Sequence, residues 1–203
     1  LCPGRAMRWR RPAVGATPGE ICVTPHCSSF IAVSLDGCIA RADGNLDWLD
    51  HANQSVPAGE DCGYAAYMAP IKAIVMGRRT LEKVLSFPEW PYADLPVYVL
   101  SHTLQAVPEE VPNSVRLHSG ALSTLMEEAA SRGLDRLYID GGRTVQSFLA
   151  EGLLREITVT TIPVLVGGGL RLFDEAGAEA LLTHRATVVY PFGFVQTRYA
   201  IGG

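Results

Sequence analysis

The feature that most limits how this chain can fold is a repeated order of short apolar strands and single helices. Several runs rich in β-branched or aromatic residues are typical of strands buried on both faces, namely CSSFIAVSL (27–35), KAIVMG (72–77), VYVLS (97–101) and LYIDGG (137–142). Helical periodicity is found between and after them, at 78–85, 121–133 and 144–152. This order predicts the α/β class, with a mostly parallel sheet covered on both faces.

The last third of the chain predicts a different edge for the sheet. Further strands are expected at VRLH (115–118), REITVTT (155–161) and PVLVGGG (163–169), with one or two more in the alternating pattern of 186–200. Because the final strands follow one another without helices, we expect them to form an antiparallel edge.

Other segments are expected to interrupt this regular order. Residues 1–25 combine Pro, Gly and Arg without a helix or strand period, and we interpret them as a disordered leader before one domain over 26–203. Residues 36–59 are rich in Asp, Gly, Asn and Pro, and we expect a long loop anchored by apolar residues such as Trp48. A short helix is expected over 64–69.

Charge and hydropathy exclude several classes of function. The formal net charge of -4 gives no general attraction to nucleic acid, and the basic residues Arg5, Arg8, Arg10 and Arg11 lie in the expected leader. No apolar run approaches the roughly 20 residues that span a bilayer, and no secretory signal pattern follows Arg11. We therefore expect a soluble, cytoplasmic protein that acts on a small molecule and binds neither nucleic acid nor membrane.

The cysteines are interpreted as reduced thiols. They number five and include no CxxC pair. A zinc site using Cys22, His26 and Cys27 is the alternative, but four suitably spaced ligands cannot be assembled from the sequence. We predict no metal.

Candidate chemistry lies where three strands end, at Gly77-Arg78-Arg79-Thr80, Ser101-His102-Thr103 and Gly141-Gly142-Arg143-Thr144. Each turn is expected to lead into a helix. Ligands of open parallel sheets bind beyond the carboxyl ends of the strands, where free N–H groups and the positive end of a helix dipole hold anions. The three turns together are predicted to hold one phosphorylated ligand. For each turn alone, the alternative is that glycine only lets the chain bend.

Glycine and arginine suit different parts of such a ligand. Gly77, Gly141 and Gly142 would let the backbone approach a phosphate, because a Cβ would otherwise stand in the way. The guanidinium groups of Arg78 and Arg79 suit a 2′-phosphate on an adenosine ribose. Neither a GxGxxG fingerprint nor a P-loop occurs, so a nucleotide would have to bind by another plan.

Five motifs occur in the order in which one family carries them: SLDGCIA with the later NLDWL, MGRRT, LSHT, YIDGGRTVQSFLAEGL, and PVLVGGGLRLF. On these motifs the chain, from about Cys27 to Tyr199, resembles the reductases related to dihydrofolate reductase and to the C-terminal reductase domain of the bifunctional riboflavin-biosynthesis deaminase-reductase. The resemblance implies a dihydrofolate-reductase-like three-layer sandwich with a mixed sheet of about eight strands. It also implies an NADPH site along the carboxyl edge of that sheet.

The resemblance assigns cofactor roles to individual residues. Ala32 would face the nicotinamide carboxamide with its backbone, and Ser101-His102 would meet the ribose 2′-phosphate. The remaining residues would hold phosphates, namely Gly77, Arg78, Arg79 and Thr80 on the adenine side and Gly141, Gly142, Arg143, Thr144 and Val145 at the diphosphate. Many relatives carry Arg or Lys in place of His102, whose charge depends on pH near neutrality. Thr144 either adds a hydroxyl bond or caps its helix.

The substrate side is less specific. Asp36, in the SLDG motif, is predicted to anchor the substrate or help deliver a proton, and the alternative is that Asp36-Gly37 only forms a turn. Trp48 either lines the same pocket or holds the loop in place. Gly167-Gly168-Gly169 is interpreted as a structural turn.

The function implied is an NADPH-dependent reductase that transfers a hydride to a small heterocycle, either pyrimidine-ribosylamine-like or pterin-like. The first substrate corresponds to a 5-amino-6-(5-phosphoribosylamino)uracil reductase. The HxE and PCxxC pattern of the zinc deaminase that accompanies such reductases does not occur in this sequence. Dihydrofolate reductase proper and a non-catalytic NADPH-binding dimeric protein are the alternatives. We expect a homodimer from the resemblance alone.

Overall fold

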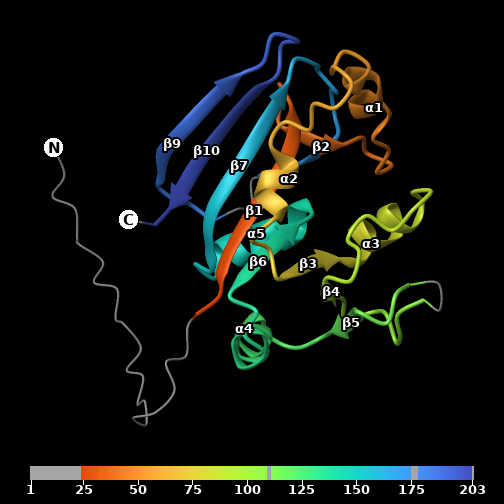
Figure 1. Cartoon of the computed structure of the whole chain (residues 1–203), viewed down its shortest axis with the longest axis vertical. Coiled ribbons are helices and arrows are strands. Elements are labelled where there is room, and N and C mark those ends of the chain that lie inside the picture. The colour runs from red at the N-terminus through yellow and green to blue at the C-terminus, as the bar shows by residue number, and fades with distance from the viewer. Residues whose placement is uncertain (1–23, 109–110, 175–177, 203) are drawn as a thin grey trace, which may run out of the picture.

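The computed structural model of this chain describes residues 24–108, 111–174 and 178–202 (Figure 1). Its centre is an eight-stranded sheet with the order β5-β4-β3-β6-β1-β7-β10-β9. The strands are β1 (His26–Ser34), β3 (Ala73–Gly77), β4 (Val97–Leu100), β5 (Val115–His118), β6 (Arg136–Asp140), β7 (Leu154–Ile162), β9 (Leu182–Val189) and β10 (Val195–Ile201). All neighbours from β5 to β7 are parallel, whereas β10 pairs antiparallel with both β7 and β9. The predicted mixed sheet with an antiparallel edge is confirmed.

Helices cover both faces of the parallel part, which completes the predicted three layers. On one face, α4 (Leu122–Ser131) and α5 (Gly142–Ala150) bury side chains such as Leu125 and Phe148 against β1, β6 and β7. On the other face, α3 (Arg78–Leu85) packs Leu81 and Val84 on β3 and β4, and the short α2 (Tyr64–Met68) packs beside it. Each fully buried Leu or Phe side chain contributes about 1.5–3 kcal/mol.

Strands β1 and β6 separate toward their carboxyl ends. β1 pairs with β6 only over His26–Ser28, but it pairs with β7 as far as Ser34. Tyr138 of β6 donates its hydroxyl to the Phe30 carbonyl at 3.1 Å, which bridges the start of the gap. Beyond that point, the β6 side of the β1 backbone has no ladder partner among the described residues.

Two sequence-based predictions of local structure were wrong. Residues 36–59 are not a plain loop, because they contain β2 (Cys38–Ala40) and α1 (Asp47–Asn53), the helix that buries Trp48. Residues 163–169 do not form a strand, and only the two-residue β8 (Leu170–Arg171) follows them and pairs with β2. Pro163 lacks an N–H for a ladder, Gly167 and Gly168 have positive φ, and the Val166 and Gly167 amides bond to a side chain instead.

The antiparallel edge extends beyond the helical layers. Strands β9 and β10, called here the β9–β10 wing, lie at one side of the sheet (Figure 1). Seven of the eight residues of β9 are exposed, so neither face of this strand is covered. No helix among the described residues has the length and apolar content needed to cross a membrane. The expected leader falls almost entirely on residues 1–23, outside the described residues.

Candidate functional site

The first turn of the candidate site joins β3 to α3. The strand ends at Gly77, whose extended backbone (φ -86°, ψ 166°) directly precedes the helix. No side chain caps this helix start, and a helix leaves its first N–H groups without intrahelical partners. Arg79 has no ion pair among the described residues, whereas Arg78 bonds Glu82 at 2.8 Å on the exposed side of the helix. The turn therefore presents free N–H groups and a free guanidinium.

The second turn joins β6 to α5 and lies against the first. Gly141 has φ +89°, and a Cβ at this position would overlap the hydroxyl of Thr80. Reciprocally, a Cβ at Gly77 would lie only 3.2 Å from the Thr144 hydroxyl. The α5 start also has no side-chain cap, so Thr144 does not cap its helix. Two uncapped helix starts thus lie side by side, and their dipoles favour a negative charge at one place.

The other residues of the second turn differ in whether their side chains and backbone amides are available to bind a ligand. Gly142 is buried, and a Cβ there would collide with the end of the Ile39 side chain. Arg143 is exposed. Val145 is fully buried in the core, and its amide already donates to the Gly141 carbonyl at 2.9 Å. Neither the side chain nor the N–H of Val145 is therefore left to hold a cofactor.

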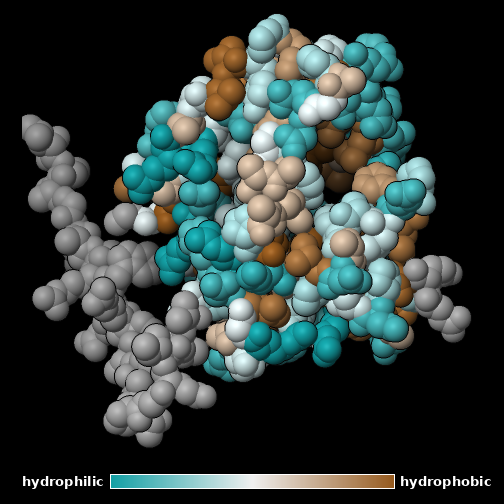
Figure 2. Space-filling model, in the orientation of Figure 1, coloured by the Kyte–Doolittle hydropathy of each residue, from teal (hydrophilic) through white to brown (hydrophobic). Residues whose placement is uncertain are grey.

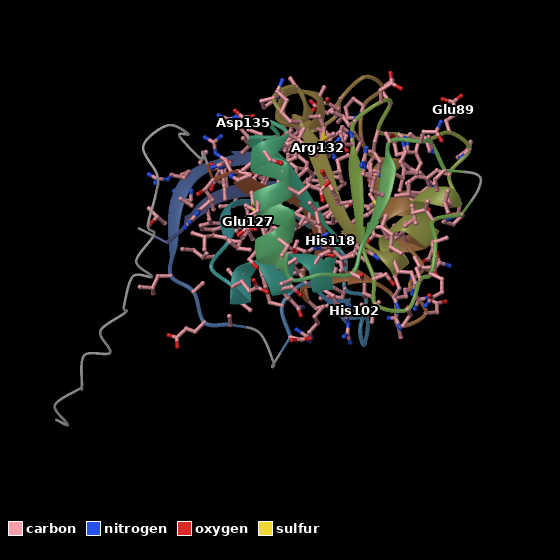
Figure 3. The ribbon with its side chains drawn as sticks, turned by 90° about the horizontal axis from the view of Figure 1, so that it is seen from below. Glu89, His102, His118, Glu127, Arg132 and Asp135 are labelled. Atoms are coloured by element: carbon pink, nitrogen blue, oxygen red, sulfur yellow. The ribbon has the colours of Figure 1, made fainter. Side chains whose placement is uncertain are left out.

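The third turn is placed as expected but is built differently. Ser101 follows β4, which pairs in register with β3 so that Leu100 lies opposite Gly77. No helix begins here, contrary to the prediction, because the Ser101 hydroxyl accepts the amides of Thr103 and Leu104 in a local turn. The Ser101 amide donates to the His118 carbonyl at 3.1 Å, and Figure 3 shows His102 and His118 at this end of the sheet. All three turns therefore lie on one edge.

Ala32 lies at the gap between β1 and β6. It pairs with Thr160 of β7 on one side, and its other side faces the gap. Trp48 is 3% exposed and packs with Ile162 and Phe194 in a cluster that also includes Ala32. Trp48 therefore anchors the segment after β2 and lies close to Ala32 at the gap between β1 and β6. Its indole N–H has no hydrogen-bond partner among the described residues.

The Asp36 carboxylate is held by four donors. The Ser34 hydroxyl donates to it at 2.6 Å, the amides of Val166 and Gly167 donate at 3.1 and 2.8 Å, and the Cys38 thiol lies at 3.9 Å. The Ser34 bond, followed by the two amide bonds, holds the pKa of Asp36 well below its usual range. Asp36 is therefore an anion at neutral pH, suited to fixing a loop or holding a cationic group and unsuited to donating a proton.

Replacing Asp36 with asparagine is expected to lower the melting temperature by a few °C at pH 7, because an amide NH₂ would face the Val166 or Gly167 N–H. The folded-state pKa of Asp36 is below the unfolded value of about 3.9, so its bonds stabilise the fold above about pH 4 and are lost as the pH falls below it. The difference between variant and wild type should therefore shrink in acid. Asp43→Asn, in the next turn, is the matched control for thermal melts.

Sequence reasoning missed Asp140, the last residue of β6. Its carboxyl accepts the Tyr92 hydroxyl at 3.3 Å and lies on the sheet face that carries α2. Burial raises the pKa of Asp140, against the opposing hydrogen bonds of the Gly141 amide and the Tyr92 hydroxyl. A carboxyl group that ends an apolar strand directly before two glycines was the available signal. Figure 2 shows a hollow with an apolar floor beside α2.

The other predictions for this region concern glycines and metals. A Cβ at Gly169 would collide with the Ala40 carbonyl, while Gly167 donates to Asp36, and both observations fit a structural turn. Among the described residues, no three His, Cys, Asp or Glu side chains gather as metal ligands would.

The fold and this edge define the class of dihydrofolate-reductase-like α/β proteins. A model of the RibD C-terminal domain family matches residues 25–194, and the chain belongs to this family. The resemblance seen in the sequence is thereby confirmed.

Three proteins illustrate the relationship. The uncharacterised protein YwjB of Bacillus subtilis is 34% identical over 161 residues, which cover 78% of this chain and 88% of YwjB. A solved structure from Shewanella sp. PV-4, described as a riboflavin biosynthesis protein, is 40% identical with a TM-score of 0.80, covering 88% of this chain and 99% of that one. Dihydrofolate reductase of Enterococcus faecalis, solved with NADP(H), shares the fold at 16% identity and a TM-score of 0.60, covering 89% and 98%.

Proposed function

We propose that this protein is an NADPH-dependent reductase that reduces a small pyrimidine-ribosylamine-like substrate. The observation that carries the proposal is the meeting of two uncapped helix starts beside the gap between β1 and β6. Membership of the RibD C-terminal domain family supports a reductase. One ligand could use both features, with a phosphate group between the two helix starts and a planar ring at the gap between β1 and β6.

The residues present fit NADPH. The amides after Gly77 and Gly141 would hold the diphosphate, with the Thr80 and Thr144 hydroxyls between the two turns. Arg79, Ser101 and His102, at the outer end of this edge, would meet the ribose 2′-phosphate. The unpaired backbone near Ala32 would bond a carboxamide. When bound, NADPH supplies a hydride for reduction of a C=N bond in the substrate.

The two carboxyl groups near the gap would then divide the remaining chemistry. Asp140, whose pKa is raised by burial, would hold a proton and pass it to the substrate nitrogen as the carbon is reduced. Asp36, which stays ionised, would bind an amino group of the substrate. The buried Trp48 side chain and the apolar floor of the hollow beside α2 would exclude water from the reacting atoms.

The cofactor part is tested by thermal melting with NADPH and with NADH. A ligand that binds only the folded state raises the melting temperature, so we expect a larger shift with NADPH. Arg79→Ala should weaken NADPH binding by roughly 10- to 100-fold through loss of a charge-assisted bond, and it should leave NADH binding nearly unchanged.

The matched control is Arg155→Ala, at the opposite, amino-terminal end of β7. Equal effects of the two substitutions on NADPH would contradict the assignment. Oxidation of NADPH with a pyrimidine ribosylamine, compared with dihydrofolate, separates the proposed reductase from dihydrofolate reductase proper. Binding of NADPH without turnover of either would favour the non-catalytic alternative.

We further propose that two copies associate through the β9–β10 wing. Val189, the last residue of β9, is 71% exposed, and Leu181, directly before β9, is 86% exposed, so apolar side chains face solvent at both ends of this edge strand. Sedimentation equilibrium is expected to show a dimer, and Val189→Glu should shift it toward monomer. A wild-type monomer at micromolar concentration would refute this arrangement.

A further inference from the structure

A pocket lies at the amino-terminal ends of the parallel strands, at the opposite edge of the sheet from the strand tips that form the candidate site. It has a volume of about 170 Å³ and opens between the C-terminal end of α2 and the amino ends of β1 and β6. His26 and Ser28 of β1 and Tyr67 of α2 contribute to its wall. Pockets for nucleotide-sized ligands measure about 300–1,000 Å³, so this one suits a ligand of only a few atoms.

Two arginines from different strands line this pocket. Arg136 begins β6, and Arg198 belongs to β10, which lies on the far side of β1 and β7 from β6. The ion pairs of the described residues lie elsewhere, at Arg41–Asp47, Arg78–Glu82 and Arg132–Glu128. Glu156 is the one carboxylate in the described pocket wall, and it lies more than 4 Å from either guanidinium. The wall thus carries two positive charges against one negative charge.

The hydroxyl groups of the pocket add a neutral donor. Ser28 is 5% exposed, and its Oγ lies 3.0 Å from the Tyr67 hydroxyl. Two hydroxyl groups have two hydrogens, and their mutual bond uses only one of them. The second hydrogen has no partner among the described residues and is available to a ligand in the pocket.

We propose that this pocket binds a small oxyanion, a phosphate or carboxylate group, between Arg136, Arg198 and the Ser28–Tyr67 hydroxyl pair. Guanidinium groups and hydroxyls on several sides match the several acceptor oxygens of such an ion. The site is separate from the proposed cofactor site, because it lies at the amino ends of strands whose carboxyl ends form the other edge.

The test is NMR titration of the isotope-labelled full chain with inorganic phosphate or acetate at constant ionic strength. Saturable shifts are expected at His26 and Tyr67, and the Gly141 and Gly142 amides report separately on phosphate held at the strand tips. Arg136→Gln and Arg198→Gln should each weaken the response at His26 by roughly tenfold or more. The matched control, Arg155→Gln, lies on β7 next to Glu156 but outside the pocket wall, and it should leave affinity unchanged.

The two ions distinguish the source of the ligand group. Saturation by phosphate alone identifies a phosphate site, and saturation by both ions identifies a general oxyanion site. Tyr67→Phe, which removes one hydroxyl and keeps the ring, should weaken binding and provides a test if an arginine variant does not fold. Shifts at His26 that rise without saturation, or equal affinities in all variants, would overturn the proposal. Saturable shifts at Gly141 alone would do so as well, while leaving the proposed function intact.

Discussion

Replacement of Asp140 by asparagine is expected to lower turnover by roughly 100-fold or more, the usual contribution of a positioned general acid. Burial raises the pKa of Asp140 and so keeps the proton on this carboxyl over a wider pH range than in water. The wild-type rate should fall as the pH rises through that pKa. The variant should lose this alkaline limb, because an amide does not titrate. Steady-state NADPH oxidation across pH measures both effects.

A matched control and a second variant make this test specific. Asp135→Asn changes an exposed carboxylate just before the other end of β6, shown in Figure 3, and should leave rate and pH profile unchanged. Tyr92→Phe removes a hydrogen bond that favours the ionised Asp140, so the alkaline limb should move to higher pH. An unaltered pH profile in Asp140→Asn, with cofactor binding intact, would remove Asp140 from the mechanism.

Substitution of Gly141 by alanine is expected to weaken NADPH binding by roughly 100-fold or more, since displacing this turn would cost about two charge-assisted hydrogen bonds to the diphosphate. The backbone at Gly141 has φ +89°, and an added Cβ would overlap the Thr80 hydroxyl. The Thr80 side chain, or the α3 start that carries it, would then have to shift. Titration of cofactor binding by fluorescence or calorimetry measures the loss.

Gly133→Ala separates the effect of the clash from that of the backbone. Gly133 lies two residues after the end of α4 with φ +68°, and a Cβ there would meet nothing within 4 Å. Both substitutions carry a conformational cost of about 1–3 kcal/mol and should lower the melting temperature. Only Gly141→Ala should weaken NADPH binding. Normal binding by a folded Gly141→Ala variant would show that the paired helix starts do not hold the cofactor.

Local patterns were sufficient to predict most of the fold. β-Branched runs and helical periodicity located the strands of the parallel sheet and the helices that cover it. Each of these elements buries apolar residues whose spacing can be recognised in its own sequence. The glycine turns after β3 and β6 were predicted for the same reason, since positive φ and close approach leave a residue-level signal. Their meeting at one edge follows from the parallel order of the strands.

Features that depend on distant partners were not predictable. The amides of Val166 and Gly167 bond to Asp36, about 130 positions earlier in the sequence, and this pairing explains why 163–169 is not a strand. The separation of β1 from β6 has no local pattern, because it concerns two strands more than 100 positions apart. Asp140 was not predictable because its raised pKa arises from burial beneath segments that are distant in the sequence, such as the one that carries Tyr92.

The mutual contact of the two glycine turns has an evolutionary consequence. The Thr80 hydroxyl fills the volume that a side chain at 141 would need, and the Thr144 hydroxyl crowds the corresponding volume at 77. Mutations in the two turns should therefore be epistatic: loss of the hydroxyl at position 80 should relieve the clash of a larger residue at 141, whereas the strain of the positive φ at 141 would remain. Among homologous sequences, a residue other than glycine at 141 should therefore be rare and should occur together with a residue that lacks a hydroxyl at 80.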